Sequence, residues 1–378
     1  DWRDVGDGFV DIGYPIAEIQ TDGVFTLTKP ANSGGLVTVG STAEQLLYEI
    51  GDPQRYLLPD VACDFTQVKI RQIDPERVQV SGAMGTPPPD QYKVSATYID
   101  GYKAAMSVQF IGFDAVEKAR LHARMGLQRA DNLLIEAGLE PFSETNVDVV
   151  GANGQFGDRD PQQIREVDLK IAVKHASKKG ADAFIQALSG LGLAAPPGLA
   201  VFQSGRPKPS PVVRLFSFLL PRNEIEMQIE NGDAVRTLKD QVFEREKYVR
   251  KVNIVLPAAV DTGQEMVSVP LVKLAWGRSG DKGDNANIGI IARRAEYAPW
   301  LWKALDEKTI REIFSHFGVT RVERFFLPGT NAINYVLLRV LGGGGVASIR
   351  LDPQGKAYAQ ILLHHKIPIP VKMAEKIS

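Results

Sequence analysis

The sequence predicts a mixed protein between the α/β and α+β classes, in which a larger mixed domain precedes a small α+β domain. Residues 66–111 alternate apolar and polar side chains in short runs that turn residues separate, which is typical of antiparallel strands. Residues 113–137 carry apolar side chains at helical spacing, and Gly138 follows them as a terminator. From Val269 onward, candidate strands and helices alternate again.

Length and composition favour a globular chain with more than one domain. The chain has 378 residues, of which 44% are hydrophobic and 24% are charged. We expect residues 1–257 to form the larger domain, residues 258–268 a linker and residues 269–378 the small domain.

Charge and cysteine usage exclude several classes of function. Lys and Arg number 44 against 45 Asp and Glu, so no basic excess argues for nucleic acid. The sequence offers neither an apolar run of ~18 residues nor a signal peptide, so no membrane span is expected. Cys63 is the single cysteine, which excludes an intrachain disulfide and a thiolate metal cluster. We expect a cytoplasmic protein, with an organelle matrix as the alternative.

The N-terminal region contains a predicted hairpin and a predicted helix. Residues 13–19 lead into a short strand that is predicted to form a hairpin with residues 24–28 across the turn Thr21-Asp22-Gly23. A capping box at residues 41–44 is predicted to start a helix that continues to Ile50.

A glycine-rich loop comes shortly before that helix. Backbone N–H groups in such a loop can bind a phosphate or a carboxylate. A tight turn shaped for packing is the equally weighted alternative. The candidate substrate-binding residues of this loop are Ser33, Gly34 and Gly35.

A second glycine-rich polar loop, residues 151–160, follows a predicted strand at residues 145–150. Ligands of α/β proteins bind at the carboxyl ends of strands, so Asn153 and Arg159 are candidate binding residues. Between the two loops, residues 92–98 and 103–111 are predicted to pair as a hairpin across Asp100-Gly101.

Residues 278–287 form the densest group of turn formers and charged side chains in the chain. Apolar runs at residues 269–276 and 288–292 predict buried strands on either side, so the ten residues are predicted to form the loop that joins them. Gly280 and Gly283 permit positive φ, which would let the loop turn several N–H groups toward an anion or a metal ion. Further on, residues 331–341 are apolar enough for a buried helix.

The chemistry of this loop is oxygen and amide chemistry. A Walker loop, a His-Glu-x-x-His motif, a nucleophile elbow and an EF-hand are all absent from the sequence. Asp281 and Asp284 could act as general acid and base, or share a divalent cation with Asn285 and Asn287. Arg278 and Lys282 could hold a carboxylate or a phosphate. The alternative is a solvated hairpin loop in which local charge pairs cancel.

These residues give the candidate site. The catalytic candidates are Asp281, Asp284 and Lys282. The substrate-binding candidates from the same loop are Arg278, Ser279, Asn285 and Asn287. A metal ligand set is not assigned.

The segment Ser279–Gly289, together with residues 13–19, 33–53 and 92–102, resembles the acyclic terpene utilisation family over essentially the whole chain. The resemblance implies a ferredoxin-like domain from Val269 onward and an acyclic-terpene-utilisation core domain before it. It also implies a further N-terminal region of roughly two hundred residues, about the size of a domain.

The resemblance associates the chain with the breakdown of acyclic terpenes such as citronellol and geraniol, and of leucine-like branched acids, as CoA thioesters. A hydratase or lyase acting on a branched 3-hydroxyacyl-CoA would suit the candidate residues, without a certain cofactor beyond the CoA thioester substrate and with a divalent cation as an option. The alternative is a non-catalytic subunit or scaffold that associates with an acyl-CoA carboxylase, which would show large apolar surface patches. The expected partners are the acyl-CoA and either a second copy of the chain or the N-terminal region.

Overall fold

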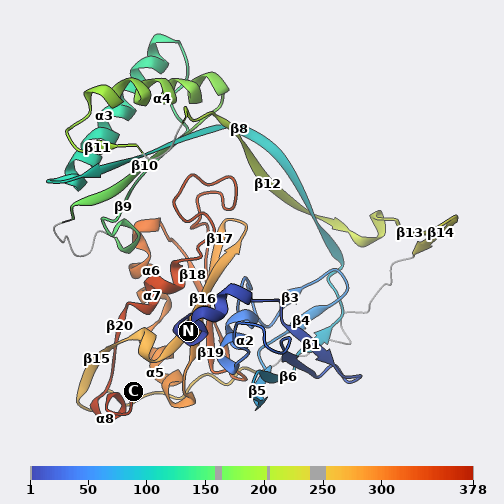
Figure 1. Cartoon of the computed structure of the whole chain (residues 1–378). Helices are drawn as coiled ribbons and strands as arrows, with labels where there is room; N and C mark the ends of the chain where they lie inside the picture. The colour runs from blue at the N-terminus through green and yellow to red at the C-terminus, as the bar shows by residue number, and fades with distance from the viewer. Residues whose placement is uncertain (1, 158–163, 202–204, 239–252, 378) are drawn as a thin grey trace. The chain divides into compact units, whose positions relative to one another are not determined.

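The computed structural model describes residues 2–157, 164–201, 205–238 and 253–377. Its contacts divide the chain into two compact units, and Figure 1 shows the helices and strands that make them up. Unit 1 consists of Asp1–Val94, Ser217–Leu338 and Gly355–Ser378, and unit 2 of Ser95–Phe216 and Arg339–Gln354. Over the described residues, every helix is too short or too polar to cross a membrane.

Unit 2 is built on an antiparallel sheet whose one face is covered by two helices (Figure 1). The strand order is β11-β8-β10-β9, and β12 also pairs with β8. The helices bury small apolar side chains such as Ala119 and Ala123 against Phe110 and Leu169 of the sheet. The elements are β8 (Gln91–Ile111), α3 (Ala115–Glu136), β9 (Glu144–Val150), β10 (Glu166–His175), α4 (Lys178–Leu191), β11 (Leu199–Ala200) and β12 (Ser210–Pro221).

The hairpin predicted across Asp100-Gly101 is wrong, because β8 is one continuous strand of 21 residues. Gly101 does adopt a positive φ of 81°, but the chain continues straight into the pairing of Tyr102 with His175. A Cβ at position 101 would lie 2.6 Å from the carbonyl oxygen of His175, so glycine is required here by a close approach and not by a turn.

Unit 2 also contains Arg339–Gln354, which enters it from the C-terminal part of the sequence. The ammonium group of Lys170 donates to the carbonyl oxygens of Ile349 and Arg350, each at 3.0 Å. Lys103 donates in the same way to Val346. Lysine side chains from β8 and β10 therefore fasten this segment through its backbone.

The N-terminal part of unit 1 contains two small antiparallel sheets and the helices α1 and α2. The first sheet has the order β1-β2-β6-β5, and its hairpin β1–β2 confirms the predicted pairing of the strand within residues 13–19 with residues 24–28. The second sheet has the order β3-β4-β7. The elements are α1 (Trp2–Val5), β1 (Ile16–Ile19), β2 (Phe25–Thr28), α2 (Val39–Leu46), β3 (Tyr56–Leu57), β4 (Ala62–Asp64), β5 (Lys69–Asp74), β6 (Arg77–Ser81) and β7 (Met84–Thr86).

Helix α2 begins earlier than the predicted capping box. Thr38 is the N-cap: its hydroxyl accepts from the N–H of Ser41, and the Ser41 hydroxyl accepts from the N–H of Thr38. The sequence contains two possible capping pairs, Thr38 with Ser41 and Ser41 with Glu44. The first pair forms, and in the helix that it starts Ala43 and Leu47 lie together on the buried face.

The C-terminal part of unit 1 is a four-stranded antiparallel sheet with the order β16-β17-β19-β18, flanked by short helices. Helix α2 contacts β16 and β17 of this sheet, so segments on both sides of the predicted linker contribute to unit 1. The strands are β13 (Met227–Asn231), β14 (Ala234–Leu238), β15 (Met266–Pro270), β16 (Ala275–Lys282), β17 (Asn285–Ala292), β18 (Val322–Leu327), β19 (Ala332–Leu337) and β20 (Lys366–Pro370). The helices are α5 (Ala298–Ala304), α6 (Glu307–Ile313), α7 (Tyr358–Leu363) and α8 (Val371–Ala374).

Two predictions for this part are wrong. Residues 331–341 contain strand β19 instead of a helix, because a central strand that is buried on both faces shows the same continuous apolar run as a buried helix. Residues 278–287 are not a ten-residue loop. They form most of the hairpin β16–β17, whose strands pair as far as Lys282 with Asn285.

Core packing in unit 2 predicts a large loss of stability when Phe184 of α4 is truncated. Phe184 is fully buried in the helix–sheet core and lies edge-on to Phe142. We expect Phe184→Ala to lower the free energy of unfolding by about 3–5 kcal/mol, because the cavity loses both transfer free energy and packing. Leu193→Ala is the control, since Leu193 is fully exposed. Urea unfolding curves compare the two variants, and equal midpoints would contradict this description of the core.

Candidate functional site

The candidate site is organised by the alternation of side chains along β16. Gly280 faces the turn that follows α2, because a Cβ there would lie 2.6 Å from Cγ of Glu49 and 2.8 Å from Cε2 of Tyr48. The neighbouring Ser279 faces the opposite way: its hydroxyl donates to the carbonyl oxygen of Lys356 at 3.1 Å and accepts from the N–H of Ala359 at 2.9 Å. Strand β16 therefore has the α2 turn on one face and the start of α7 on the other.

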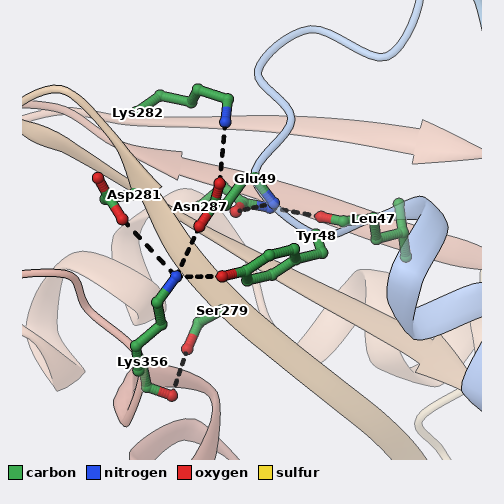
Figure 2. A network of polar contacts seen from close by, with 8 residues as sticks. All are labelled: Leu47, Tyr48, Glu49, Ser279, Asp281, Lys282, Asn287 and Lys356. Carbon is green, nitrogen blue, oxygen red and sulfur yellow. Dashed lines mark hydrogen bonds and ion pairs between the residues drawn. The ribbon is translucent and has the colours of Figure 1, made fainter. Parts of the chain in front are cut away.

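Lys356 connects the two faces around this edge strand (Figure 2). Its ammonium group donates to Oε1 of Glu49 at 2.6 Å and to the hydroxyl of Tyr48, and it lies 3.7 Å from Oδ1 of Asp281. Lys282 reaches the other carboxylate oxygen of Glu49 at 3.1 Å. Two lysines and two carboxylates thus form one network, in which Glu49 is more than 200 residues from its lysine partners.

Glu49 is an ionised group held in place, and its surroundings explain why. Partial burial opposes its charge, but hydrogen bonds from Lys356, Tyr48 and Lys282 outweigh burial and lower the pKa of Glu49 to about 2. Burial likewise opposes the charge of Lys356, while the hydrogen bonds to Glu49 and Tyr48 raise its pKa. At neutral pH Glu49 is therefore a fixed anion and a poor proton acceptor.

The aromatic ring of Tyr48 is bordered by two cations. The guanidinium carbon of Arg278 lies 4.5 Å from the ring centroid, and the nitrogen of Lys356 lies at the same distance. Arg278 is exposed, and the side chain of Lys356 retains 38% of its accessible surface. The outer surface of the network is therefore cationic.

A buried amide pair fixes the backbone of the α2 turn. Oδ1 of Asn287 accepts from the N–H of Glu49 at 2.9 Å, and Nδ2 donates to the carbonyl oxygen of Leu47 and to Oδ1 of Asn334. Asn334 in turn donates to the carbonyl oxygen of Gly51 at 2.7 Å. These bonds hold Glu49 at a φ of 57°, a left-handed conformation that a glutamate rarely adopts.

The predicted loop residues therefore divide into two groups. Ser279 and Asn287 are buried, with 1% and 2% of their surface exposed, and their polar atoms bond to protein backbone or to Asn334. Their contacts position α7 and the α2 turn. Arg278, Asp281 and Lys282 remain at least partly accessible.

Asp284 and Asn285 lie at the closed end of the hairpin, where Gly283 supplies the positive φ of the turn. A divalent cation shared by Asp281, Asp284, Asn285 and Asn287 does not fit this arrangement, because the Asn287 oxygen already accepts from the Glu49 amide. Among the described residues, no three His, Cys, Asp or Glu side chains come together in a way that could hold a metal ion.

The remaining candidate residues belong to the other two glycine-rich loops, at residues 33–35 and 151–160. The loop of Ser33, Gly34 and Gly35 packs on the N-terminal segment: Gly34 donates to the carbonyl oxygen of Asp11 at 2.7 Å, and a Cβ at Gly34 would collide with the backbone of Gly8. Close packing therefore explains these glycines, and their role in binding stays a prediction.

Asn153 belongs to unit 2, where it adopts a φ of 58° before a 3-10 turn at Gly154–Phe156. The strand before it, β9, pairs antiparallel with β10, whereas the argument for a ligand at this strand end assumes a parallel sheet. Arg159 lies outside the described residues.

Sequence reasoning missed four residues of the site: Tyr48, Glu49, Lys356 and Glu44. Burial raises the pKa of Glu44, whose carboxyl feels the opposing charges of Arg278 and Arg293. Tyr48 and Glu49 fall within residues 33–53, one of the segments that carry the family resemblance, so that segment was the available signal. No sequence pattern marked Lys356 as a site residue, because a lysine between two turns looks like any other surface lysine.

Two family models match the chain. One, described as acyclic terpene utilisation family protein AtuA, matches residues 1–231, and one described as AtuA ferredoxin-like domain matches residues 269–368. Comparison with curated proteins and with solved structures gives no match. The predicted resemblance and the predicted mixed fold with a ferredoxin-like C-terminal domain are confirmed.

The contact at Gly280 predicts that even a methyl group there is destabilising. We expect Gly280→Ala to lower the free energy of unfolding by about 1–3 kcal/mol, because the Tyr48 ring and the Glu49 stem must move to make room. Gly13→Ala is the matched control in unit 1, since a Cβ there meets open space and φ is not positive. Denaturant unfolding of both variants measures the difference, and a Gly280→Ala variant as stable as Gly13→Ala would contradict the close approach.

The low pKa of Glu49 predicts an acid-dependent contribution to stability. A carboxyl group whose folded-state pKa lies below its usual value of 4.5 stabilises the fold fully above pH 4.5, and the contribution is lost as pH falls toward about 2. The stability difference between the wild type and Glu49→Gln should therefore shrink over this window. Glu312→Gln, which removes a carboxylate from an exposed ion pair with Lys308, is the control. A Glu49→Gln difference that is constant from pH 5 to pH 2 would refute the ion pairing of Glu49.

Proposed function

Because the chain belongs to the acyclic terpene utilisation family, we propose that it is an enzyme of acyclic terpene or branched-chain acid catabolism. The proposed step is a hydration or its reverse, a lyase reaction, on a branched acyl-CoA thioester. The observation that carries this proposal is the position of Lys356, whose ammonium group lies against the Tyr48 hydroxyl and within 3.7 Å of Asp281.

The arrangement suits removal of a proton next to a thioester carbonyl. Asp281 is the proposed base, since Glu49, with a pKa of about 2, holds a proton too weakly to act as one near neutral pH. The proton donors of Lys356 and Tyr48 stabilise the enolate oxygen that forms when the proton leaves. Glu49 balances the charge of both lysines and keeps Lys356 in place.

In the lyase direction, the substrate is a branched 3-hydroxyacyl-CoA. Asp281 takes the proton from C2, and the C2–H electrons form the enolate. The enolate then expels the hydroxyl group from C3, which leaves as water with a proton from Asp284, and a C2=C3 double bond remains. Asp281 then gives its proton to water and Asp284 takes a proton back from water, so both carboxyl groups return to their starting state, and hydration follows the same steps in reverse.

In this proposal, the remaining candidate residues bind the substrate or hold the backbone of the site in position. Arg278 and Lys282, which are exposed, attract the anionic substrate. Asn285 lies beside Asp284 at the turn and orients the substrate, whereas Ser279 and Asn287 position the backbone. Binding by the loop of residues 33–35, and by Asn153 and Arg159, stays part of the proposal.

The compartment, the assembly and the domain boundaries are also part of the proposal. We propose a cytoplasmic or organelle-matrix enzyme that acts as a homo-oligomer or with a further N-terminal region. The division of the sequence into a core domain (1–257), a linker (258–268) and a ferredoxin-like domain (269–378) is likewise proposed.

A scaffold that docks with an acyl-CoA carboxylase is the second candidate, and one observation favours it. In unit 2, strand β12 exposes the apolar side chains of Val213 and Leu215 on one face, and exposed apolar surface is typical of a region that another protein covers. Co-purification with a carboxylase in the absence of any turnover would favour this candidate over the enzyme.

The enzyme proposal predicts that Asp281→Asn lowers kcat by about 10²–10⁴-fold, because an amide cannot accept the C2 proton. Asp284→Asn should lower it as well. The assay follows the ultraviolet absorbance of the conjugated enoyl thioester from branched 3-hydroxyacyl-CoA, with and without a divalent cation. Asp22→Asn, in an exposed hairpin turn, is the control that keeps full activity. Absence of turnover by the wild type, or full turnover by both Asp281→Asn and Asp284→Asn, would refute the assignment of these two residues as catalytic.

A further inference from the structure

A second cationic site lies at the opposite end of β16 from Asp281. It is a cavity of about 330 Å³ in unit 1, between the 3-10 turn at Leu271–Lys273, the segment after β17 and the C-terminal residues after α8. Five of its eight lining residues are cations: Arg3, Lys273, Arg293, Arg294 and Lys376. Neither the sequence prediction nor the proposed reaction uses any of them.

Carboxylates lie near two of these cations. Arg294 pairs with Glu296 at 3.7 Å, and the charges of Glu44 and Asp4 reach Arg293. Partial burial lowers the pKa of Arg293, whose Nε donates to the carbonyl oxygen of Val272 at 3.2 Å. Five like charges around one cavity repel one another, and an anion bound among them would offset this cost.

The walls favour an organic anion over a simple ion. Val272, Tyr297 and Ile377 supply apolar surface, and the volume is at the lower end of that of small-molecule sites. Arg293 also lies 4.9 Å from the ring centroid of Trp276, which holds its guanidinium group at the rim. Several cations next to apolar and aromatic surface suit a nucleotide that carries more than one phosphate group.

The position of the cavity relates it to the proposed reaction. Trp276 and Asp281 lie on the same strand, five residues apart, which corresponds to roughly 17 Å along an extended backbone. Arg278 lies between them, and Glu44 is within electrostatic reach of both Arg278 and Arg293. The pantetheine arm of CoA is an extended chain suited to joining two sites separated in this way.

We propose that this cavity binds the 3′-phosphorylated adenosine diphosphate head of the CoA thioester, an inference that rests on the proposed acyl-CoA substrate. Lys273, Lys376 and Arg293 hold the phosphate groups, and Tyr297, Val272 and Ile377 contact the nucleoside. The thioester end then reaches Asp281 and Lys356 along β16.

The test is calorimetric binding of adenosine 3′,5′-bisphosphate, which lacks the thioester and so measures the head-group site alone. The double variant Lys273→Gln/Lys376→Gln should weaken binding at least tenfold, and Lys273→Arg/Lys376→Arg should restore it because the charges are kept. Lys303→Gln/Lys308→Gln removes two exposed lysines elsewhere in unit 1 and should leave binding unchanged. Asp281→Asn should also bind the bisphosphate as tightly as the wild type does.

Three outcomes would overturn the inference: no binding of the bisphosphate, equal binding by the glutamine double variant, or binding of ADP, ATP or inorganic phosphate as tight as that of the bisphosphate. The last result would indicate a general anion site or another nucleotide. Failure of the proposed reaction is a separate result, since it would appear as bisphosphate binding without turnover. Turnover with an unchanged KM in the double variant would instead preserve the reaction and remove the head-group site.

Discussion

The absence of a side chain at position 280 is the constraint on which the candidate site depends. The turn after α2 lies against β16 so closely that a Cβ would overlap the Tyr48 ring and the Glu49 stem. The same is true one strand further in, where a Cβ at Gly289 would lie 2.6 Å from Cβ of Leu47. Two glycines opposite the same turn let an ionised carboxylate and a phenol reach an edge strand that carries its own charges. Without this approach, Lys356 would lose its contacts to Glu49 and Tyr48.

Within the network, Glu49 holds a fixed charge, whereas Asp281 is the proposed proton acceptor. Glu49 receives hydrogen bonds from both lysines, and its pKa falls so far that it stays an anion throughout the physiological range. Beneath it, the amides of Asn287 and Asn334 carry no charge and fix the backbone instead. Asp281 makes only a longer contact to Lys356, at 3.7 Å. In the proposed reaction, Asp281 and not the better-connected Glu49 is therefore the residue that takes the proton.

Much of the fold could be predicted from local sequence signals, and the site only in part. The hairpin at residues 16–28 and the helix after Asp114 have turn and periodicity signals that tertiary contacts leave unchanged. Strand β19 was mistaken for a helix because its six buried residues show no alternation. The glycines of residues 278–287 were predicted to form a wide loop. In the structure, Gly280 allows close packing against the α2 turn, and Gly283 lies in a two-residue hairpin turn. The partners Tyr48, Glu49 and Lys356 are set by contacts across more than 200 residues, which no local pattern contains.

The way in which the chain is divided between the two units has a consequence for how the protein is made. Unit 1 takes its last segment from Gly355–Ser378, after the chain has contributed Arg339–Gln354 to unit 2. During synthesis on the ribosome, α2 and the hairpin β16–β17 emerge well before Lys356 does. A chain that stops after residue 338 would contain Glu49, Asp281 and Lys282 but not the cation that joins them. The charged network can therefore be completed only after Lys356 has been synthesised.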